Sequence, residues 1–233
     1  VIPATVPSPI CNENVLSGGP RQRASEKDMS TTCRSCEKPP TTGRRNSPMV
    51  EITTEISIRP AVAEDAAEIA LVHVESWRST YAGILPEEIL LNLSSNQHEA
   101  RWWRSVLGRL RRNHFVYVAE TGEGEVAGFC SAGPSRHPSL PYGAEVYTIY
   151  LRDEFHGVGA GRQLFASTVA AVGEVRGPSV IVWCLVGNPS RYFYEAMGGS
   201  LVARRPSKVG TENVEEVGYA WNDTAELAVW GSS

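Results

Sequence analysis

The chain has 233 residues, of which 42% are hydrophobic and 21% are charged, and its formal net charge is -4. This length permits one generous domain or two small ones. Five cysteines are too few for a disulfide scaffold, and no run of about 18 uncharged apolar residues is present, so neither a disulfide-rich secreted domain nor a membrane-spanning helix is expected. We therefore expect a soluble, cytoplasmic globular protein.

The first 48 residues differ in composition from the rest. They carry a net charge of +3, seven of the 15 prolines and no aromatic residue, whereas residues 49–233 carry a net charge of -7. A segment without aromatic anchors or hydrophobic periodicity cannot bury enough apolar surface to offset its chain entropy. We predict a disordered tail over 1–48 and one folded domain over 49–233, with Met49 as the hypothetical start of translation. The tail's single C-x-x-C pair, Cys33 and Cys36, lacks the further ligands of a zinc site, so no metal is expected.

The patterned part begins with a short alternating segment, Ile56–Arg59, that predicts a strand ending at Pro60. Apolar residues at helical spacing then predict three helices, over 64–81, 86–93 and 97–112. Strand patterns follow at 115–120 and 125–131, as a hairpin, and at 145–151. A helix over 161–175, a buried strand over 180–186, a short helix over 192–197 and strands near 200–204 and 215–221 complete the pattern.

A glycine-rich loop, F-H-G-V-G-A-G-R at 155–162, lies between a predicted strand and a predicted helix. Glycines let the backbone approach a ligand closely, and the free N–H groups at a helix start attract an anion, so the loop indicates a phosphate-bearing cofactor. The alternative is a tight turn that binds nothing. A dinucleotide fingerprint is excluded because Arg162 or Leu164 stands where a small residue is required, and no G-K-[ST] follows for a nucleotide P-loop.

Two segments resemble the GNAT acyltransferases. The H-x-x-G-x-G of the loop is similar to the family's [Q/R]-x-x-G-x-[G/A] pyrophosphate loop, with His156 in place of Gln or Arg. The segment N-P-S-R-Y-F-Y-E-A-M-G-G at 188–199 is similar to the family's N-x-x-x-x-F-Y-E-x-x-G segment. The two motifs occur in the family's order, and the resemblance covers residues 56–221.

The resemblance implies an α/β fold with a GNAT-like twisted mixed sheet of six or seven strands and helices on both faces. It also implies a cleft for acetyl-CoA where the strands at 145–151 and 180–186 splay apart. Backbone groups of the central strand would hold the pantetheine arm, and the loop would hold the pyrophosphate. Carried onto this sequence, the cofactor-binding residues are Ile149, Leu151, His156, Gly157, Val158, Gly159, Ala160, Gly161, Arg162 and Asn188.

The same resemblance implies that Tyr194 donates a proton to the departing CoA thiolate; the alternative is a tyrosine packed at a helix end. Glu145, at the start of the central strand, is the candidate base for the acceptor amine, and a solvated strand-end carboxylate is the alternative. Trp77 and Tyr81 lie one helical turn apart and are candidates for contacting the acceptor, although such a pair is more often part of a core.

The predicted function is transfer of an acetyl group from acetyl-CoA to a primary amine by direct attack in a ternary complex. A non-catalytic acyl-CoA-binding or sensor module is the alternative. A nucleic-acid partner is not expected, because the folded part is acidic. A membrane partner is not expected either. Polyamines, amino acids, aminoglycosides, ribosomal N-termini and lysines all remain candidate acceptors, and a homodimer is a further possibility that the family suggests.

Overall fold

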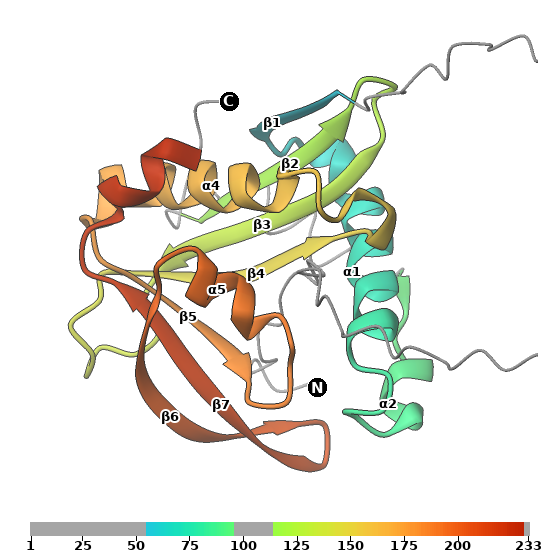
Figure 1. Cartoon of the computed structure of the whole chain (residues 1–233). Coiled ribbons are helices and arrows are strands. Elements are labelled where there is room, and N and C mark those ends of the chain that lie inside the picture. The colour runs from blue at the N-terminus through green and yellow to red at the C-terminus, as the bar shows by residue number, and fades with distance from the viewer. Residues whose placement is uncertain (1–54, 96–113, 231–233) are drawn as a thin grey trace, which may run out of the picture. The chain divides into compact units, whose positions relative to one another are not determined.

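The computed structural model describes residues 55–95 and 114–230. Within these ranges seven strands form a single sheet of order β1-β2-β3-β4-β5-β7-β6, in which β4 and β5 pair in parallel and all other neighbours are antiparallel (Figure 1). The strands are β1 (Ile56–Pro60), β2 (Phe115–Thr121), β3 (Val126–Pro134), β4 (Ala144–Leu151), β5 (Val180–Leu185), β6 (Ser200–Val209) and β7 (Glu212–Trp221). The helices are α1 (Ala66–Thr80), α2 (Glu87–Leu91), α4 (Ala160–Arg176) and α5 (Arg191–Ala196), with short 3₁₀ segments at 63–65, 153–155 and 224–230.

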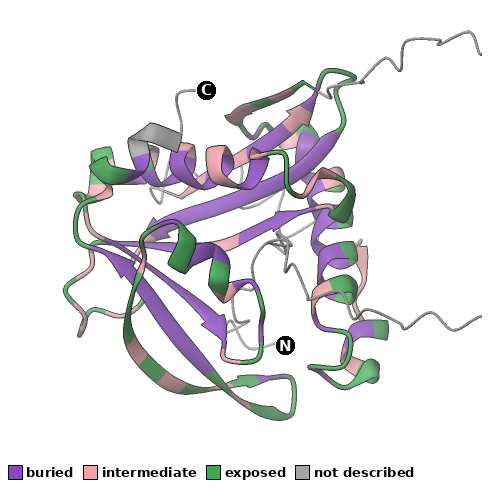
Figure 2. Ribbon diagram, viewed as in Figure 1, coloured by how far each residue is buried: buried purple, intermediate pink, exposed green. Residues whose placement is uncertain are grey.

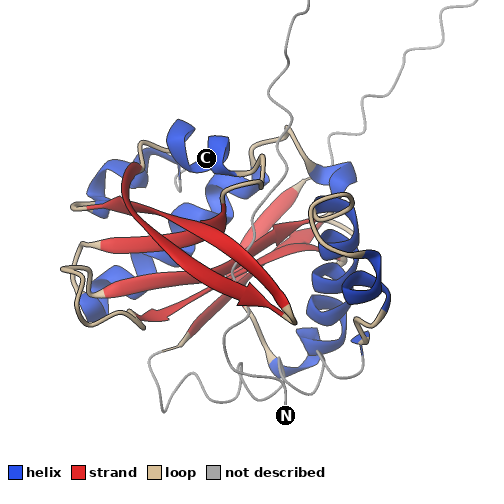
Figure 3. Ribbon diagram, turned by 90° about the horizontal axis from the view of Figure 1, so that it is seen from below, coloured by secondary structure: helices blue, strands red, loops and turns tan. Residues whose placement is uncertain are grey.

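Helices cover both faces of the sheet (Figure 3). One core cluster packs α4 and α5 against β2, β3, β4, β5 and β7, and a second packs α1 and α2 against the opposite face of β2 to β5. Successive side chains of a strand point to opposite faces, so a central strand is buried on both sides. All six residues of β5 are buried, as its continuous apolar run predicted (Figure 2).

A β-bulge interrupts the central strand β4. Ser131 of β3 pairs with Thr148, but the next residue, Ala132, pairs with Val146, so Tyr147 is an extra residue in β4. A bulge changes the alternation of side chains along a strand. Val146 and Ile149 accordingly both pack into the cluster under α4, although an odd number of positions separates them.

The parallel pairing of β4 with β5 is short. It comprises three residue pairs and ends at Val146 with Val182, immediately before the bulge. Beyond that point the two strands diverge, as Figure 1 shows, while β4 remains paired to β3 and β5 to β7. The backbone N–H and C=O groups of residues 147–151 that point towards β5 therefore form no hydrogen bonds with that strand.

The predicted fold class is confirmed, and most elements lie where the sequence placed them. The last two strands are longer than predicted, because β6 is largely exposed and lacks the apolar alternation that marks a strand, whereas its backbone pairs with β7 along nearly its whole length. The predicted helix over 97–112 and the predicted disordered tail over 1–48 lie outside the described residues. None of the helices in the described ranges is long and apolar enough to span a bilayer.

The close approach of β3 to β4 requires a glycine at position 128. A Cβ atom there would lie 2.5 Å from the Tyr150 carbonyl oxygen and 2.5 Å from a methyl carbon of Leu151. We expect Gly128→Ala to lower the free energy of unfolding by about 1–3 kcal/mol, since overpacking displaces backbone. Urea denaturation measures this value. Gly122→Ala is the control, because its nearest neighbour would be 3.9 Å away; equal effects of both substitutions would contradict the prediction.

Candidate functional site

The loop between β4 and α4 depends on two glycines for its backbone conformation. Gly157 and Gly159 have φ angles of +79° and +87°, in the left-handed region that other residues rarely adopt. A Cβ at either position would meet nothing within 4 Å, so the glycines serve the conformation of the chain and not close packing. The space beside them is open to a ligand.

The amides of this loop are available as hydrogen-bond donors. Among the described residues, no backbone hydrogen bond is donated by any N–H group of 157–161, and Gly159, at the N-cap of α4, has no side-chain cap. The first amides of an α-helix have no partner within the helix, and they lie at the positive end of its dipole. A row of such donors is suited to an anion, and a phosphate fits both its charge and its number of acceptors.

His156 is turned away from this row of amides. Its Nε2 lies 3.0 Å from the Leu151 carbonyl oxygen, its Nδ1 lies 3.8 Å from a carboxylate oxygen of Asp153, and its own N–H donates to the Asp153 carbonyl. The ring thus ties the loop to the end of β4. The predicted contact of His156 with the cofactor stays a prediction.

Ile149 and Leu151 can reach a ligand between the strands only through their backbones. Their side chains are buried under α4. The Ala144 N–H group points towards β5 and donates to the Ser179 carbonyl. Backbone N–H groups alternate between the two edges of a strand, and the bulge shifts this alternation by one residue. The N–H groups of Ile149 and Leu151 therefore also point to the edge that faces β5.

The second motif follows β5 and is anchored through Asn188. The Asn188 side chain is fully buried, accepts a hydrogen bond of 2.8 Å from the Ser190 amide, and donates one of 3.2 Å to the Tyr81 hydroxyl. Its amide group is therefore occupied in holding the β5–α5 connection against the end of α1. The predicted cofactor contact of Asn188 stays a prediction.

Tyr194 of α5 lies in an aromatic cluster on the α4 side of the sheet. Its side chain is fully buried, and its ring centroid is 5.6 Å from that of Phe193, 5.8 Å from that of Tyr219 and 6.0 Å from that of Phe165 in α4. The ring is thus positioned by the two helices that follow β4 and β5.

The two sequence motifs meet because β4 and β5 are parallel. The loop at 156–161 leaves the carboxyl end of β4, and the segment at 188–199 leaves the carboxyl end of β5, so both lie at the end of the sheet where the strands diverge. In open α/β sheets, ligands bind at the carboxyl ends of parallel strands. The geometry supports one ligand that extends from the loop into the opening of the strand pair.

Trp77 of α1 and Tyr81, which caps its C-terminus, are core residues. Trp77 is 3% and Tyr81 0% exposed, and the Trp77 indole N–H donates to the Tyr150 hydroxyl at 2.5 Å. Burial also raises the pKa of Tyr81 well above its ordinary value. The pair ties α1 to β4 and to the β5–α5 connection, and its predicted contact with an acceptor stays a prediction.

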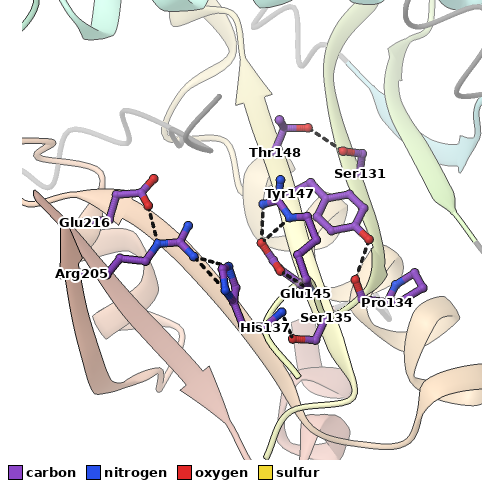
Figure 4. Close-up of polar contacts among 10 residues, drawn as sticks. Ser131, Pro134, Ser135, His137, Glu145, Tyr147, Thr148, Arg205 and Glu216 are labelled. Carbon is purple, nitrogen blue, oxygen red and sulfur yellow. Dashed lines mark hydrogen bonds and ion pairs between the residues drawn. The ribbon is translucent and has the colours of Figure 1, made fainter. Parts of the chain in front are cut away.

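Glu145 lies on the face of β4 opposite α4 and is fully buried. One of its carboxylate oxygens accepts a hydrogen bond from the Arg136 backbone N–H at 2.9 Å, and the other accepts two from the Arg136 guanidinium (Figure 4). Three hydrogen bonds from one arginine thus hold this carboxylate, which differs from the solvated strand-end carboxylate that was the alternative. The predicted role as base stays untested.

Sequence reasoning missed a second buried carboxylate beside the first. Glu216 of β7 is fully buried and accepts a hydrogen bond of 2.6 Å from Nε of Arg205, its register partner in β6. His137 contacts the same guanidinium (Figure 4). The sequence offers consecutive pairs at 204–205 and 215–216. The pairing of β7 with β5 and of β6 with β7 determines which member of each pair faces inwards.

Two other classes of chemistry have little support in the described residues. Cys130 and Cys184 are buried in β3 and β5, and burial raises the pKa of each thiol to about 12. A thiol that remains protonated at neutral pH is a poor nucleophile. No three His, Cys, Asp or Glu side chains in the described part of the chain gather as a metal site.

Comparison with known proteins agrees with this arrangement. The model of the acetyltransferase (GNAT) family matches residues 74–198, which include the glycine-rich loop and all but the last residue of the second motif. A Bacillus subtilis protein, the uncharacterized N-acetyltransferase YuaI, is 37% identical over 173 residues, covering 74% of this chain and 96% of the relative.

Solved structures share the fold at low sequence identity. An N-acetyltransferase from Staphylococcus aureus superposes with a TM-score of 0.59 at 18% identity, over 73% of this chain and 99% of that one. PaiA from Thermoplasma acidophilum, in complex with coenzyme A, gives 0.55 at 20% identity, over 70% and 98%. Salmonella typhimurium yncA, solved with acetyl-CoA, gives 0.56 at 19% identity, over 72% and 94%.

The family model and the Bacillus relative confirm the prediction of an N-acetyltransferase. The matched region spans the divergent ends of β4 and β5 together with the loop and the helix that leave them. By its sequence and by its fold, the chain belongs to the GNAT family of acetyltransferases.

Proposed function

We propose that this enzyme moves an acetyl group from acetyl-CoA to a primary amine by direct attack in a ternary complex. One observation carries the proposal. The backbone N–H groups of 157–161, beside the divergent strands β4 and β5, donate no backbone hydrogen bond within the described residues and can therefore bind a ligand. The coenzyme A and acetyl-CoA recorded with two structures of the same fold support the choice of ligand.

In this proposal the pyrophosphate is held by the amides of residues 157–161 and by the guanidinium of Arg162. A hydrogen bond to a charged group contributes about 1.5–3 kcal/mol, so two or three of them suffice to fix the nucleotide end. His156 contributes indirectly, because its ring and its amide are both engaged with residues that precede the loop. The amides of Ile149 and Leu151 would hold the pantetheine arm.

Chemistry at the divergent strand ends then needs no covalent enzyme intermediate. The amine nitrogen forms the new bond to the acetyl carbon as the carbon–sulfur bond breaks. The nitrogen gives one proton to water, and the sulfur receives one. Tyr194 is the proposed donor of the latter proton, since a phenol and a thiolate have comparable basicity. The ion pair of Glu145 supports a positioning role, in which this carboxylate orients Arg136.

We expect acetyl-CoA to bind the full chain in a calorimetric titration, and Gly159→Glu to weaken binding by more than about tenfold, because the new carboxylate would repel the phosphates. The matched control is Gly124→Glu in the β2–β3 turn, where φ is +85° and a Cβ also meets nothing within 4 Å. Equal affinities of the two variants would contradict the placement of the cofactor, and no binding to the folded wild type would overturn the proposed function.

Tyr194→Phe tests the proton donor. Phenylalanine keeps the ring contacts with Phe165, Phe193 and Tyr219, so the fold and the affinity for acetyl-CoA should be retained. Loss of general acid catalysis should lower kcat by about 10²–10⁴-fold. Steady-state kinetics with any amine that the wild type acetylates measures the change. An unaltered kcat would leave Tyr194 only a packing role.

The two buried thiols should not react in the native state. Because their pKa values are raised to about 12, we expect iodoacetamide to leave Cys130 and Cys184 unmodified at about pH 8 and to label both after unfolding in guanidinium chloride. Peptide mass spectrometry locates the label, and the unfolded sample is the control. Cys184→Ala should retain acetyl transfer; its loss without unfolding would favour an acetyl-cysteine route.

A further inference from the structure

Two arginines on the face of the sheet opposite α4 are held in the same manner. Arg136 binds the buried Glu145 and lies over the ring of Tyr147, with its guanidinium carbon 4.6 Å from the ring centroid. Arg205 binds the buried Glu216 and lies 3.9 Å from the ring centroid of Trp183. Each arginine is thus fixed by one carboxylate and one aromatic ring, and we call these two groups of three residues the arginine units.

The arginine units flank the point where β4 and β5 diverge. The last pair of these strands is Val146 with Val182, so Tyr147 and Trp183 are the first residue of each strand beyond it. Val182 packs under α4, whereas Trp183 belongs to a small cluster on the opposite face. The arginines therefore approach the opening between the strands from the face that the glycine loop and Tyr194 do not occupy.

His137 connects the two arginine units without adding a charge. It follows Arg136 in the chain, its ring contacts the Arg205 guanidinium, and its ring centroid is 5.4 Å from that of Trp183. Burial, together with the nearby Arg205, lowers the pKa of His137, so the ring is neutral at neutral pH. The positive charge on this face is that of the guanidinium groups.

Both guanidinium groups retain donors and access to solvent. A guanidinium has five N–H donors in a planar fork, and the side chains of Arg136 and Arg205 are 38% and 19% exposed. Glu216, by contrast, is fully buried, and its Oε1 has no hydrogen-bond partner in the described part of the chain. The cluster therefore offers guanidinium N–H groups to an anion.

Stability alone does not account for such a cluster. A buried ion pair contributes little compared with apolar residues of similar volume, because desolvation of the charges offsets their attraction. What the carboxylates and the rings do supply is a fixed orientation of each guanidinium. A fixed fork loses little side-chain entropy when it binds a carboxylate with two parallel hydrogen bonds.

We propose that the arginine units bind the carboxylate of an α-amino acid, whose amino group is the acetyl acceptor. This inference rests on the proposed function and names its acceptor class. An α-amino acid carries a carboxylate for Arg136 and Arg205. Polyamines and lysine side chains lack the carboxylate and would bring only positive charge to two arginines. The product is an N-acetyl amino acid.

The test compares each proteinogenic α-amino acid with its α-amide as acceptor, using the full chain, acetyl-CoA and mass spectrometry of the acetylated product. We expect kcat/KM for the best acid to exceed that of its amide by more than about tenfold. Amine reactivity opposes this preference, because an amino amide has the lower ammonium pKa and so more free amine. Spermidine and a lysine peptide should be poorer acceptors than that acid.

The double variant Arg205→Leu/Glu216→Leu removes one arginine unit without leaving a buried charge unpaired. This variant should retain its affinity for acetyl-CoA, while the ratio of kcat/KM for the acid to kcat/KM for its amide falls towards unity. The matched control is Arg204→Leu/Glu215→Leu, an exposed ion pair of 3.7 Å in the same two strands, which should leave the ratio unchanged. If the double variant does not fold, Arg136→Lys provides the second test, since lysine keeps the charge opposite Glu145 but loses the fork.

Two sets of outcomes overturn the inference. The first is a wild-type enzyme that acetylates amides, spermidine or the lysine peptide as well as it acetylates acids. The second is a preference for acids that survives in both Arg205→Leu/Glu216→Leu and Arg136→Lys. In either case a calorimetric titration of the wild type with acetyl-CoA distinguishes the two failures. If acetyl-CoA binds, only the acceptor inference fails; if it does not bind, the proposed function fails as well.

Discussion

The short parallel pairing of β4 with β5 is the constraint on which the rest of the site depends. Three residue pairs join the strands, and the bulge at Tyr147 follows the last of them. Each strand stays anchored on its other side, β4 to β3 and β5 to β7, so the divergence costs only the hydrogen bonds between the two. Those unused backbone groups, and the helices that leave the same ends, then become available to a ligand.

The two faces of the sheet present different groups near this opening: backbone amides on one face and side chains on the other. On the α4 face, the donors at 157–161 are main-chain amides, so left-handed glycines matter there more than the identity of neighbouring side chains. The His156 ring fastens this loop to the Leu151 carbonyl. On the opposite face the charged groups near the opening are the guanidinium groups of Arg136 and Arg205, each held by a buried carboxylate.

The buried charges are the strongest departure from the pattern of a simple core. Glu145 and Glu216 are fully buried in central strands, where apolar residues would be expected, and each has an arginine partner from a more exposed segment. Removing one partner would leave an uncompensated charge in the interior, so each pair is retained or lost as a unit. The cost is understandable if the orientation of the two guanidinium groups is what the enzyme requires.

The sequence by itself determined the order of the elements and the position of the glycine loop, because hydrophobic periodicity and a cluster of glycines are local signals that span a few neighbouring residues. The fold class followed from the resemblance of two sequence motifs to a known family. Three features were decided only by the tertiary structure. The burial of Trp77 and Tyr81 depends on contacts with Tyr150 and Asn188, which lie more than 70 residues away in the chain. The bulge at Tyr147 depends on the register with β3. The pairing of Glu216 with Arg205 depends on how β6 meets β7, since a shift of β6 by one residue would turn Arg205 to the other face.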